Sequence, residues 1–154
     1  MHPLLRSALA GVATGARSFS ALTACARTPG GTNRAERLLH RPRIRSSLTS
    51  SAVLELLGDK LPVTPPRNSP SALAGRVALG AISGGLVSVR ANGSGRLGAV
   101  VGATTSAAWT MAGPRYRALA AERAGSDLPG ALAEDTAALA LAYAATTADG
   151  SRTR

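Results

Sequence analysis

Apolar residues along the chain gather into stretches separated by short polar connections. Leu54, Leu57 and Leu61 recur at the spacing of one helix face, and a proline directly after them ends that helix. Ser69 followed by Pro70 is typical of the cap and first residue of another helix. Because no stretch alternates as a β-strand does, the pattern predicts an all-α protein of four to five helices. The predicted helices cover residues 7–26, 47–60, 71–89, 97–114 and 127–148.

The connection over residues 27–46 differs from the others because it is strongly basic. It holds six arginines and shows no apolar periodicity, so we expect an exposed linker. Residues 149–154 form a polar tail, and the whole of 1–154 is expected to be a single helical domain. The arginines of the linker are Arg27, Arg34, Arg37, Arg41, Arg43 and Arg45.

The lengths of the apolar segments favour a multi-pass membrane bundle. Residues 97–114 provide about 18 uncharged residues, the usual length for a helix that spans a bilayer. The segments 7–26 and 127–148 reach this length if one arginine or one acidic pair lies within the membrane. Residues 47–60 extend over only about 21 Å, so we expect them to form a tilted, half-buried or re-entrant helix.

Small residues recur every four positions in two of the predicted helices. This spacing places them on one helix face, where they let the backbone of a neighbouring helix approach closely, as membrane helices do. A soluble alanine-rich bundle is the alternative explanation. Such faces also permit self-association into a homo-oligomer. The predicted packing residues are Gly80, Gly84, Gly98 and Gly102, followed by Ser106 and Thr110.

The charge of the chain bears on which kind of partner it could bind. The formal net charge is +10, and charged residues make up 17% of the chain, against roughly 25% in average proteins. A basic chain can contact anionic lipid or nucleic acid. The basic linker lacks the interleaved aromatic residues typical of single-strand binding. We therefore expect a lipid bilayer, and no nucleic acid, as the partner.

Metal and catalytic chemistry have little support in the sequence. The single cysteine, Cys25, excludes an internal disulfide and a cysteine-based zinc site. The LTAC box ending at this cysteine resembles a lipoprotein cleavage site, but a charge interrupts its apolar run, so a buried or interfacial cysteine is favoured. His2 and His40 lie apart from any carboxylate cluster. The stretch GSGRLG, residues 93–98, lacks the strand that a dinucleotide site needs, so it predicts a turn. We expect no cofactor, no metal and no enzymatic activity.

Eight charged residues lie in or beside the apolar segments. Glu55 and Asp59 are four apart on one helix face and repel unless a cation lies between them. An isolated charge inside a membrane costs about 2.5–3.5 kcal/mol. The economical arrangement is therefore a cluster in which acids meet bases. The candidates are Glu55, Asp59, Glu134 and Asp135, with Arg17, Lys60, Arg67 and Arg76.

Three stretches together resemble a known family. They are SAVLELLGDKLPVTPPR, GRVALGAISGG and LPGALAEDTAALALA, with GARSF at residues 15–19 as a fourth match. The combination resembles the bacterial membrane proteins grouped as domain-of-unknown-function 4126, particularly the short, arginine-rich actinobacterial kind. The resemblance implies a plasma-membrane location and no particular activity. It also implies that an E-x-x-x-D-K-x-P element and an acidic pair matter, here Glu55, Asp59, Lys60 and Pro62, then Glu134 and Asp135.

These observations favour an integral membrane protein whose acid–arginine cluster fixes helix packing. The first alternative is a small channel or transporter component that uses the same charges as an ion, proton or solute site. The second is a soluble basic helical protein that binds nucleic acid.

The arginine content places the linker 27–46 on the cytoplasmic side. Five crossings would leave Arg115, Arg117 and Arg123 outside. If residues 47–60 do not cross, those three lie inside while Arg90 and Arg96 lie outside. Both arrangements remain open at this point.

Overall fold

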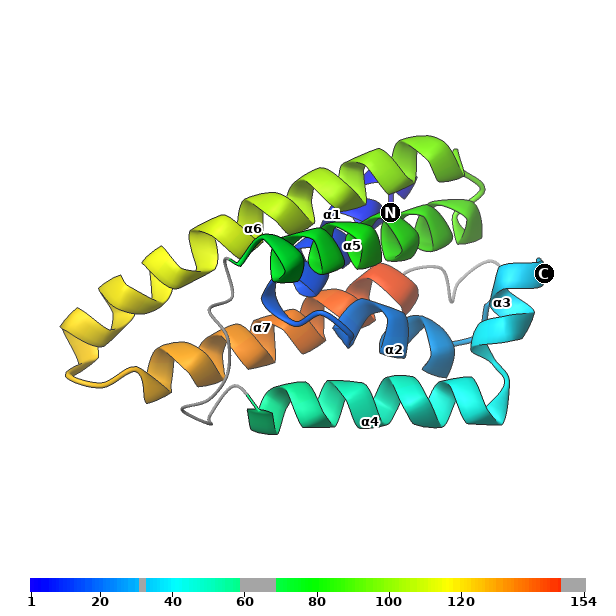
Figure 1. The fold of residues 1–154 in the computed structure, drawn as a ribbon. Coiled ribbons are helices and arrows are strands. Elements are labelled where there is room, and N and C mark those ends of the chain that lie inside the picture. The colour runs from blue at the N-terminus through cyan, green and yellow to red at the C-terminus, as the bar shows by residue number, and fades with distance from the viewer. Residues whose placement is uncertain (31–32, 59–68, 148–154) are drawn as a thin grey trace.

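Seven α-helices and no strand make up the residues that the computed structural model describes, which are 1–30, 33–58 and 69–147 (Figure 1). The predicted all-α fold is confirmed, whereas the predicted number of four to five helices was too low. The predicted tail 149–154 lies outside the described residues. The helices are α1 (Pro3–Ala16), α2 (Ser20–Arg27), α3 (Arg34–Leu39), α4 (Pro42–Gly58), α5 (Pro70–Arg90), α6 (Gly95–Ala124) and α7 (Leu128–Thr147).

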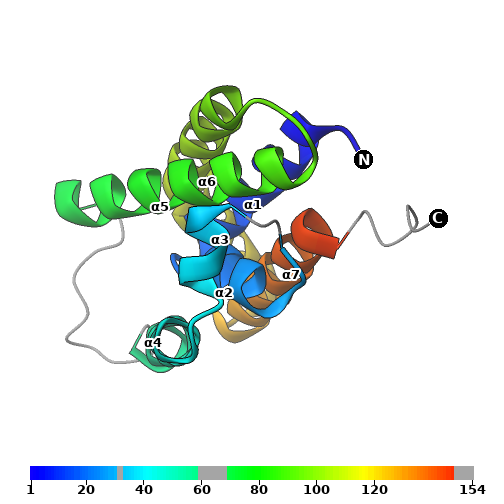
Figure 2. The same ribbon diagram turned by 90° about the vertical axis from the view of Figure 1, so that its right-hand side faces the viewer.

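The helices form a bundle with α1 at its centre. α5 and α6 pack against each other and against α1, and α7 packs on another side of α1. α2 lies against α7, while α4 is an outer helix whose main contact is with α2 (Figures 1 and 2). The chain runs back and forth along the bundle, so that α3 and the turn between α5 and α6 lie at the same end (Figure 1).

The first predicted helix, residues 7–26, is in fact two helices. Arg17 has an extended backbone with φ −139° and ψ 110°, which ends α1. The amides of Ser18 and Phe19 then donate to the carboxylate of Glu55 in α4, at 2.8 and 3.3 Å. This break depends on an acid far away in sequence, so the local apolar pattern could not reveal it.

The basic linker 27–46 is also more ordered than its pattern predicts. Its middle forms α3, because Asn33 caps this helix by accepting a hydrogen bond from the amide of Glu36 at 2.9 Å. α4 then begins at Pro42, a residue suited to the first position of a helix. The arginines of the linker are exposed, with Glu36 as the buried charge among them.

The later helices agree with their predicted boundaries to different degrees. α5 agrees with the predicted 71–89 to within one residue at each end. α6, in contrast, passes through Pro114 and ends only at Gly125, which has a left-handed φ of 70°. The turn between α5 and α6 covers residues 91–94, with a positive φ of 57° at Asn92, so the GSGRLG stretch supplies the end of this turn and the first residues of α6. Ser94 caps α6 by accepting a hydrogen bond from the amide of Leu97 at 3.4 Å.

Glycines occupy the crossing of α5 and α6. A Cβ atom at Gly80 would lie 2.7 Å from the carbonyl oxygen of Gly102, and one at Gly84 would lie 2.8 Å from the Cα of Gly102. One at Gly98 would lie 2.6 Å from the carbonyl oxygen of Gly84. The structure thus places the four predicted packing glycines where two backbones touch.

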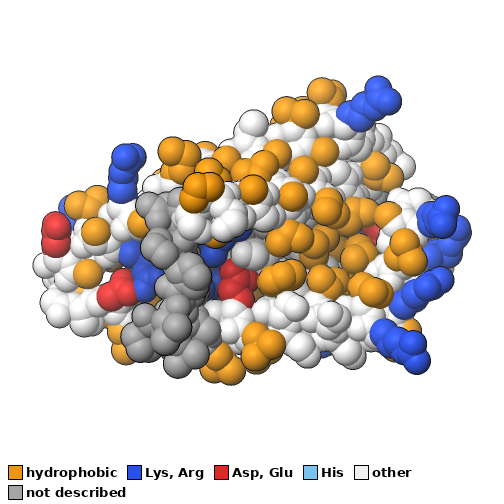
Figure 3. Space-filling view, viewed as in Figure 1, with side chains coloured by type: hydrophobic (Ala, Val, Ile, Leu, Met, Phe, Trp, Pro, Cys, Tyr) orange, Lys and Arg blue, Asp and Glu red, His pale blue; other side chains and the backbone are white. Residues whose placement is uncertain are grey.

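In this fold small side chains form most of the core, and many large apolar side chains are exposed. The buried apolar cluster consists of alanines, Cys25 and Val87. Apart from Leu22, Leu86 and Val87, the described large apolar side chains lie wholly or partly at the surface. Figure 3 shows hydrophobic side chains spread over one face. The largest exposed fractions are those of Leu54 at 67%, Met111 at 63%, Val100 at 61% and Tyr143 at 61%.

By length and hydropathy, α5 alone among the described helices qualifies as a membrane span, with a mean hydropathy of 1.6. The sequence pattern had singled out residues 97–114 because they carry no charge. Glycine, serine and threonine dilute the hydropathy of that segment. Only 33% of the qualifying window in α5 is buried inside the protein.

Candidate functional site: two buried arginine–carboxylate clusters

A first cluster of charges surrounds the break between α1 and α2, and we call it the Glu55 cluster. Arg17, at the break, donates through Nε to Oδ1 of Asp135 in α7 at 2.6 Å. Arg76, in the first third of α5, lies 3.4 Å from Oε1 of Glu55. All four side chains are mostly buried, with exposed fractions between 6% and 17%. Each acid therefore meets its own arginine.

Glu55 has a second role, because its carboxylate lies at the start of α2. Besides the two amides at the break, the hydroxyl of Ser18 donates to Oε1 at 2.8 Å. The first amides of a helix carry a partial positive charge, which favours an anion at this position. The Glu55 carboxylate thus serves as a cap for a helix that has no side-chain cap of its own at Phe19.

Arg76 binds the other helix end at this break, the C-terminus of α1. Its Nη1 donates to the carbonyl of Gly15, in the last turn of α1, at 2.7 Å. A cation is favoured at a helix C-terminus for the same reason that an anion is favoured at an N-terminus. The Arg76–Glu55 pair therefore complements both helix ends that the break creates.

Of the remaining candidates of the predicted cluster, the structure describes only Glu134. Glu134 is 2% exposed and faces α6, where a Cβ atom at Gly113 would lie 3.2 Å from its Oε1. The indole nitrogen of Trp109 lies near the same glycine and has no hydrogen-bond partner among the described residues. The structure does not pair Arg17 with Glu55 directly, because Asp135 and Arg76 take those places. Asp59, Lys60 and Arg67 lie outside the described residues.

A second cluster, which the sequence patterns did not reveal, lies around Glu36 of α3. We call it the Glu36 cluster. Arg90, the last residue of α5, donates to both carboxylate oxygens of Glu36, at 2.6 Å each. The same guanidinium donates to the carbonyl of Cys25 at 2.6 Å and to the hydroxyl of Thr28 at 2.9 Å. Glu36 is fully buried, so this two-bond pair ties α3 and the end of α2 to α5.

Two further groups belong to this end of the bundle. Arg6 is 2% exposed and donates to the carbonyls of Ala145 and Thr146, at 2.7 and 3.1 Å, which caps the end of α7. His40 approaches Glu36, with 3.8 Å between Nε2 and Oε2. One feature of the sequence indicates a helix start here: Glu36, the first acid of the chain, follows Asn33 at capping-box spacing.

The two clusters lie at opposite ends of α5. Arg76 and Arg90 are fourteen positions apart in one helix, which corresponds to about 21 Å along its axis. The buried hydroxyls between them bond mainly to backbone. Ser106 donates to the carbonyl of Arg76 at 2.9 Å, and Ser7 to that of Gly84 at 2.8 Å. This part of the interior is therefore a packed polar seam.

Charge is distributed unequally between the ends of the bundle. We call the end that holds the Glu36 cluster the basic end, because Glu36 is the one described acid there. Figure 3 shows blue side chains gathered at this end. Its arginines are Arg6, Arg27, Arg34, Arg37, Arg41, Arg43, Arg45, Arg90 and Arg96. The opposite end mixes Arg17, Arg76, Arg115, Arg117 and Arg123 with Glu55, Glu122, Asp127, Glu134 and Asp135.

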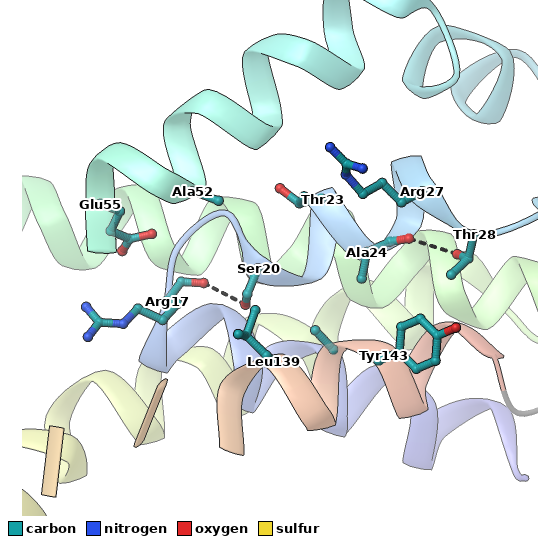
Figure 4. Close-up of a pocket in the computed structure, with 11 residues that line it drawn as sticks. Arg17, Ser20, Thr23, Ala24, Arg27, Thr28, Ala52, Glu55, Leu139 and Tyr143 are labelled. Atoms are coloured by element: carbon teal, nitrogen blue, oxygen red, sulfur yellow. Dashed lines mark hydrogen bonds between the residues drawn. The ribbon is translucent and has the colours of Figure 1, made fainter. Parts of the chain in front are cut away.

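A half-open groove of about 380 Å³ runs between α2, α4 and α7 (Figure 4). Arg17 and Glu55 lie at one end of it, and Arg27 and Thr28 at the other. The walls between these ends are apolar over most of their length, formed by Ala24, Ala52, Leu139, Ala142 and Tyr143, beside Ser20 and Thr23.

Among the described residues, no three or more histidine, cysteine, aspartate or glutamate side chains are grouped so that they could hold a metal ion. The chain matches no protein-family model, and no curated protein or solved structure matches it significantly. The geometry of the two clusters is therefore the basis for a functional assignment.

Proposed function

We propose that the chain is a small multi-pass membrane protein of the bacterial plasma membrane, in which buried ion pairs fix the arrangement of the helices. The observation that carries this proposal is the exchange of large and small side chains. Alanine, glycine, serine and threonine fill most of the interior, while the described leucine, valine and methionine side chains, apart from the buried Leu22, Leu86 and Val87, lie wholly or partly at the surface. In water this arrangement exposes extended apolar surface, whereas in lipid it costs nothing and lets small-residue faces pack.

The lengths of the helices are compatible with the same conclusion, although α5 is the one described helix whose hydropathy also qualifies it as a span. α4, α5 and α7 contain 17, 21 and 20 residues. At the rise of an α-helix these lengths correspond to about 26, 32 and 30 Å, close to the hydrocarbon thickness of about 30 Å. α6 is longer and extends beyond that thickness. α1 and α2 form a hairpin that enters and returns on the same side.

The proposed topology places the basic end in the cytoplasm. Loops rich in arginine are retained on the cytoplasmic side of bacterial membranes. Arg90 and Arg96 lie at the same end as the linker 27–46, and Arg115, Arg117 and Arg123 lie at the other. The proposal therefore has four crossings, by α4 to α7, after the α1–α2 hairpin.

The position of the clusters supports a structural role for the charges. With α5 spanning the bilayer, Arg90 lies at one interface, and Arg76, six residues from the other end of the helix, lies about 9 Å inside the opposite one. Each arginine described there binds a carboxylate or caps a helix end. Charges satisfied in this way specify helix register. We propose no enzymatic activity, and the likeness to the family of unknown function named above belongs to this proposal.

The alternative role, as a small channel or transporter component, has one observation in its favour. Glu134 is buried beside the unpartnered indole nitrogen of Trp109. A buried acid with a polar neighbour is suited to binding an ion or a proton. In that case Glu134→Gln abolishes an ion flux into vesicles while expression stays normal. Unchanged flux would leave the structural role as the better account.

Membrane fractionation tests the proposal. We expect the protein to stay in the membrane pellet through washes with alkaline carbonate and with high salt, and to dissolve only in detergent. A peripheral basic protein bound to lipid or nucleic acid by charge would leave in the salt wash. Release in either wash would contradict the proposed multi-pass insertion.

A further inference from the structure

We infer that the groove between α2, α4 and α7 binds one acyl chain of an anionic phospholipid, whose phosphate lies beside Arg27. The inference rests on the proposed membrane function, because it requires the groove to open towards lipid. Exposed apolar side chains border the groove on α7, where Leu139 and Tyr143 are 54% and 61% exposed. The open side of the groove therefore continues into the apolar outer surface.

The size of the groove suits an acyl chain and not a helix. A methylene takes up about as much space as a water molecule, about 30 Å³, so a volume of about 380 Å³ holds roughly a dozen of them. A helix is at least about 10 Å across, so the same volume would hold only about one turn. A partner helix, or a second copy of this chain, would thus find little room.

The charges at the two ends of the groove give the bound lipid a direction. At one end, Asp135 neutralises Arg17, and Glu55 is neutralised by Arg76. At the other end, Arg27 donates only to the hydroxyl of Thr49, at 3.0 and 3.3 Å, and has no acidic partner among the described residues. The positive end of the groove is therefore the place for a phosphate.

A second cation lies near this end. The hydroxyl of Thr49 donates to the carbonyl of Arg45, one turn earlier on the same face of α4. Arg45 is exposed and, within the described part of the chain, has no acidic partner either. Tyr143 also lies at this end (Figure 4), where the amphipathic ring of a tyrosine marks the headgroup level of a bilayer. Arg27 and Tyr143 thus line this end of the groove, and Arg45 lies one turn away from Thr49 on α4.

Lipid retention tests this inference. The protein is reconstituted in vesicles of equal phosphatidylglycerol and phosphatidylcholine, extracted in mild detergent, and examined by native mass spectrometry for bound lipid. We expect about one retained phosphatidylglycerol per chain. Replacing both cations, Arg27→Gln with Arg45→Gln, is expected to lower the preference for phosphatidylglycerol at least tenfold. Arg96→Gln, an exposed arginine away from the groove, is the control for charge and should change nothing.

A second pair of variants tests the groove itself. Ala52→Phe fills it from α4, so retention of both lipids should fall severalfold. Val53→Phe adds the same ring at the next position, which does not line the groove, and should retain lipid as the parent does. Equal lipid retention by the Ala52 and Val53 variants would overturn the inference. Loss of an oligomer from the mass spectrum of Ala52→Phe would also overturn the inference, because it would mean that a second copy of the chain, and not a lipid, occupies the groove.

Failure of this inference is distinguishable from failure of the proposed function. The same membranes are washed with alkaline carbonate before extraction. Retention in the membrane together with no lipid preference contradicts only the lipid site. Release by carbonate contradicts the proposed function, whatever lipid is found.

Discussion

The contact between α5 and α6 provides a test in which one helix supplies both the variant and its control. Gly80 and Gly75 both lie in α5. A Cβ atom at Gly80 would lie 2.5 Å from the Cβ of Ser106 and 2.7 Å from the carbonyl oxygen of Gly102. A Cβ atom at Gly75 would have no neighbour within 4 Å. Gly80→Ala and Gly75→Ala therefore make the same chemical change in opposite environments.

The expected difference follows from two opposing effects. Alanine in a helix interior is favoured over glycine by about 1 kcal/mol, and both variants gain this amount. Overpacking costs a further 1–3 kcal/mol or so, and only Gly80→Ala incurs it, because the obstructing carbonyl belongs to the backbone of α6. The two variants should thus differ by about 1–3 kcal/mol. For a chain of this size that corresponds to roughly 2–12 °C in melting temperature.

The assay uses the single cysteine as a reporter of unfolding. Cys25 is fully buried, so a maleimide should label it only when the bundle opens. The temperature of half-labelling in mild detergent is measured for the parent and both variants. We expect Gly75→Ala to match or exceed the parent and Gly80→Ala to fall below it. If Gly80→Ala is as stable as Gly75→Ala, the close approach of α5 and α6 is wrong.

Two further predictions concern the ion pairs. Arg17→Asp and Asp135→Arg should each destabilise the bundle by about 3–5 kcal/mol, as expected when one partner of a buried pair is lost, and the double exchange should recover much of that loss. The matching exchange of Glu55 and Arg76 should not recover stability, since an arginine at position 55 cannot accept hydrogen bonds from the amides at the start of α2. Stability is measured as the half-labelling temperature. Equal recovery in the two exchanges would contradict the capping role. Glu36→Gln should raise the labelling rate of the single cysteine by roughly 100-fold, because a loss of about 3 kcal/mol at the Arg90 pair favours local opening by that factor. An unchanged rate would show that this pair does not hold the end of α2 in place.

The elements predicted correctly from sequence are those set by local chemistry. α5 begins at Ser69 and Pro70, a cap and first residue that act within one turn, and its small residues every four positions lie on the side that meets α6. The break at Arg17 could not be predicted, because the group that stabilises it is a carboxylate of α4. Likewise, the helix continues through Pro114 even though this residue lacks the amide that would bond to the carbonyl of Thr110.

The candidate site divides in the same way. Spacing and charge identified Arg17, Glu55, Arg76 and Asp135 as residues that would need partners, and the structure supplies their partners. Which acid meets which base depends on the fold of the α1–α2 hairpin, and no local pattern of residues indicated that hairpin. The Glu36 cluster was missed for another reason. Its acid lies in a segment with no apolar periodicity, so nothing marked that segment as buried.

The central claim is that the exposed apolar side chains face lipid. Nitroxide labels on cysteines introduced at Leu54, Val100 and Leu139 place one probe on each of α4, α6 and α7, and the native cysteine is too buried to be labelled. In vesicles, collisions of each label with oxygen, which concentrates in the bilayer, are compared with collisions with a water-soluble nickel complex. The account predicts that oxygen dominates at all three positions. Dominant collisions with the nickel complex would show that these faces lie in water, and that the bundle does not cross the membrane.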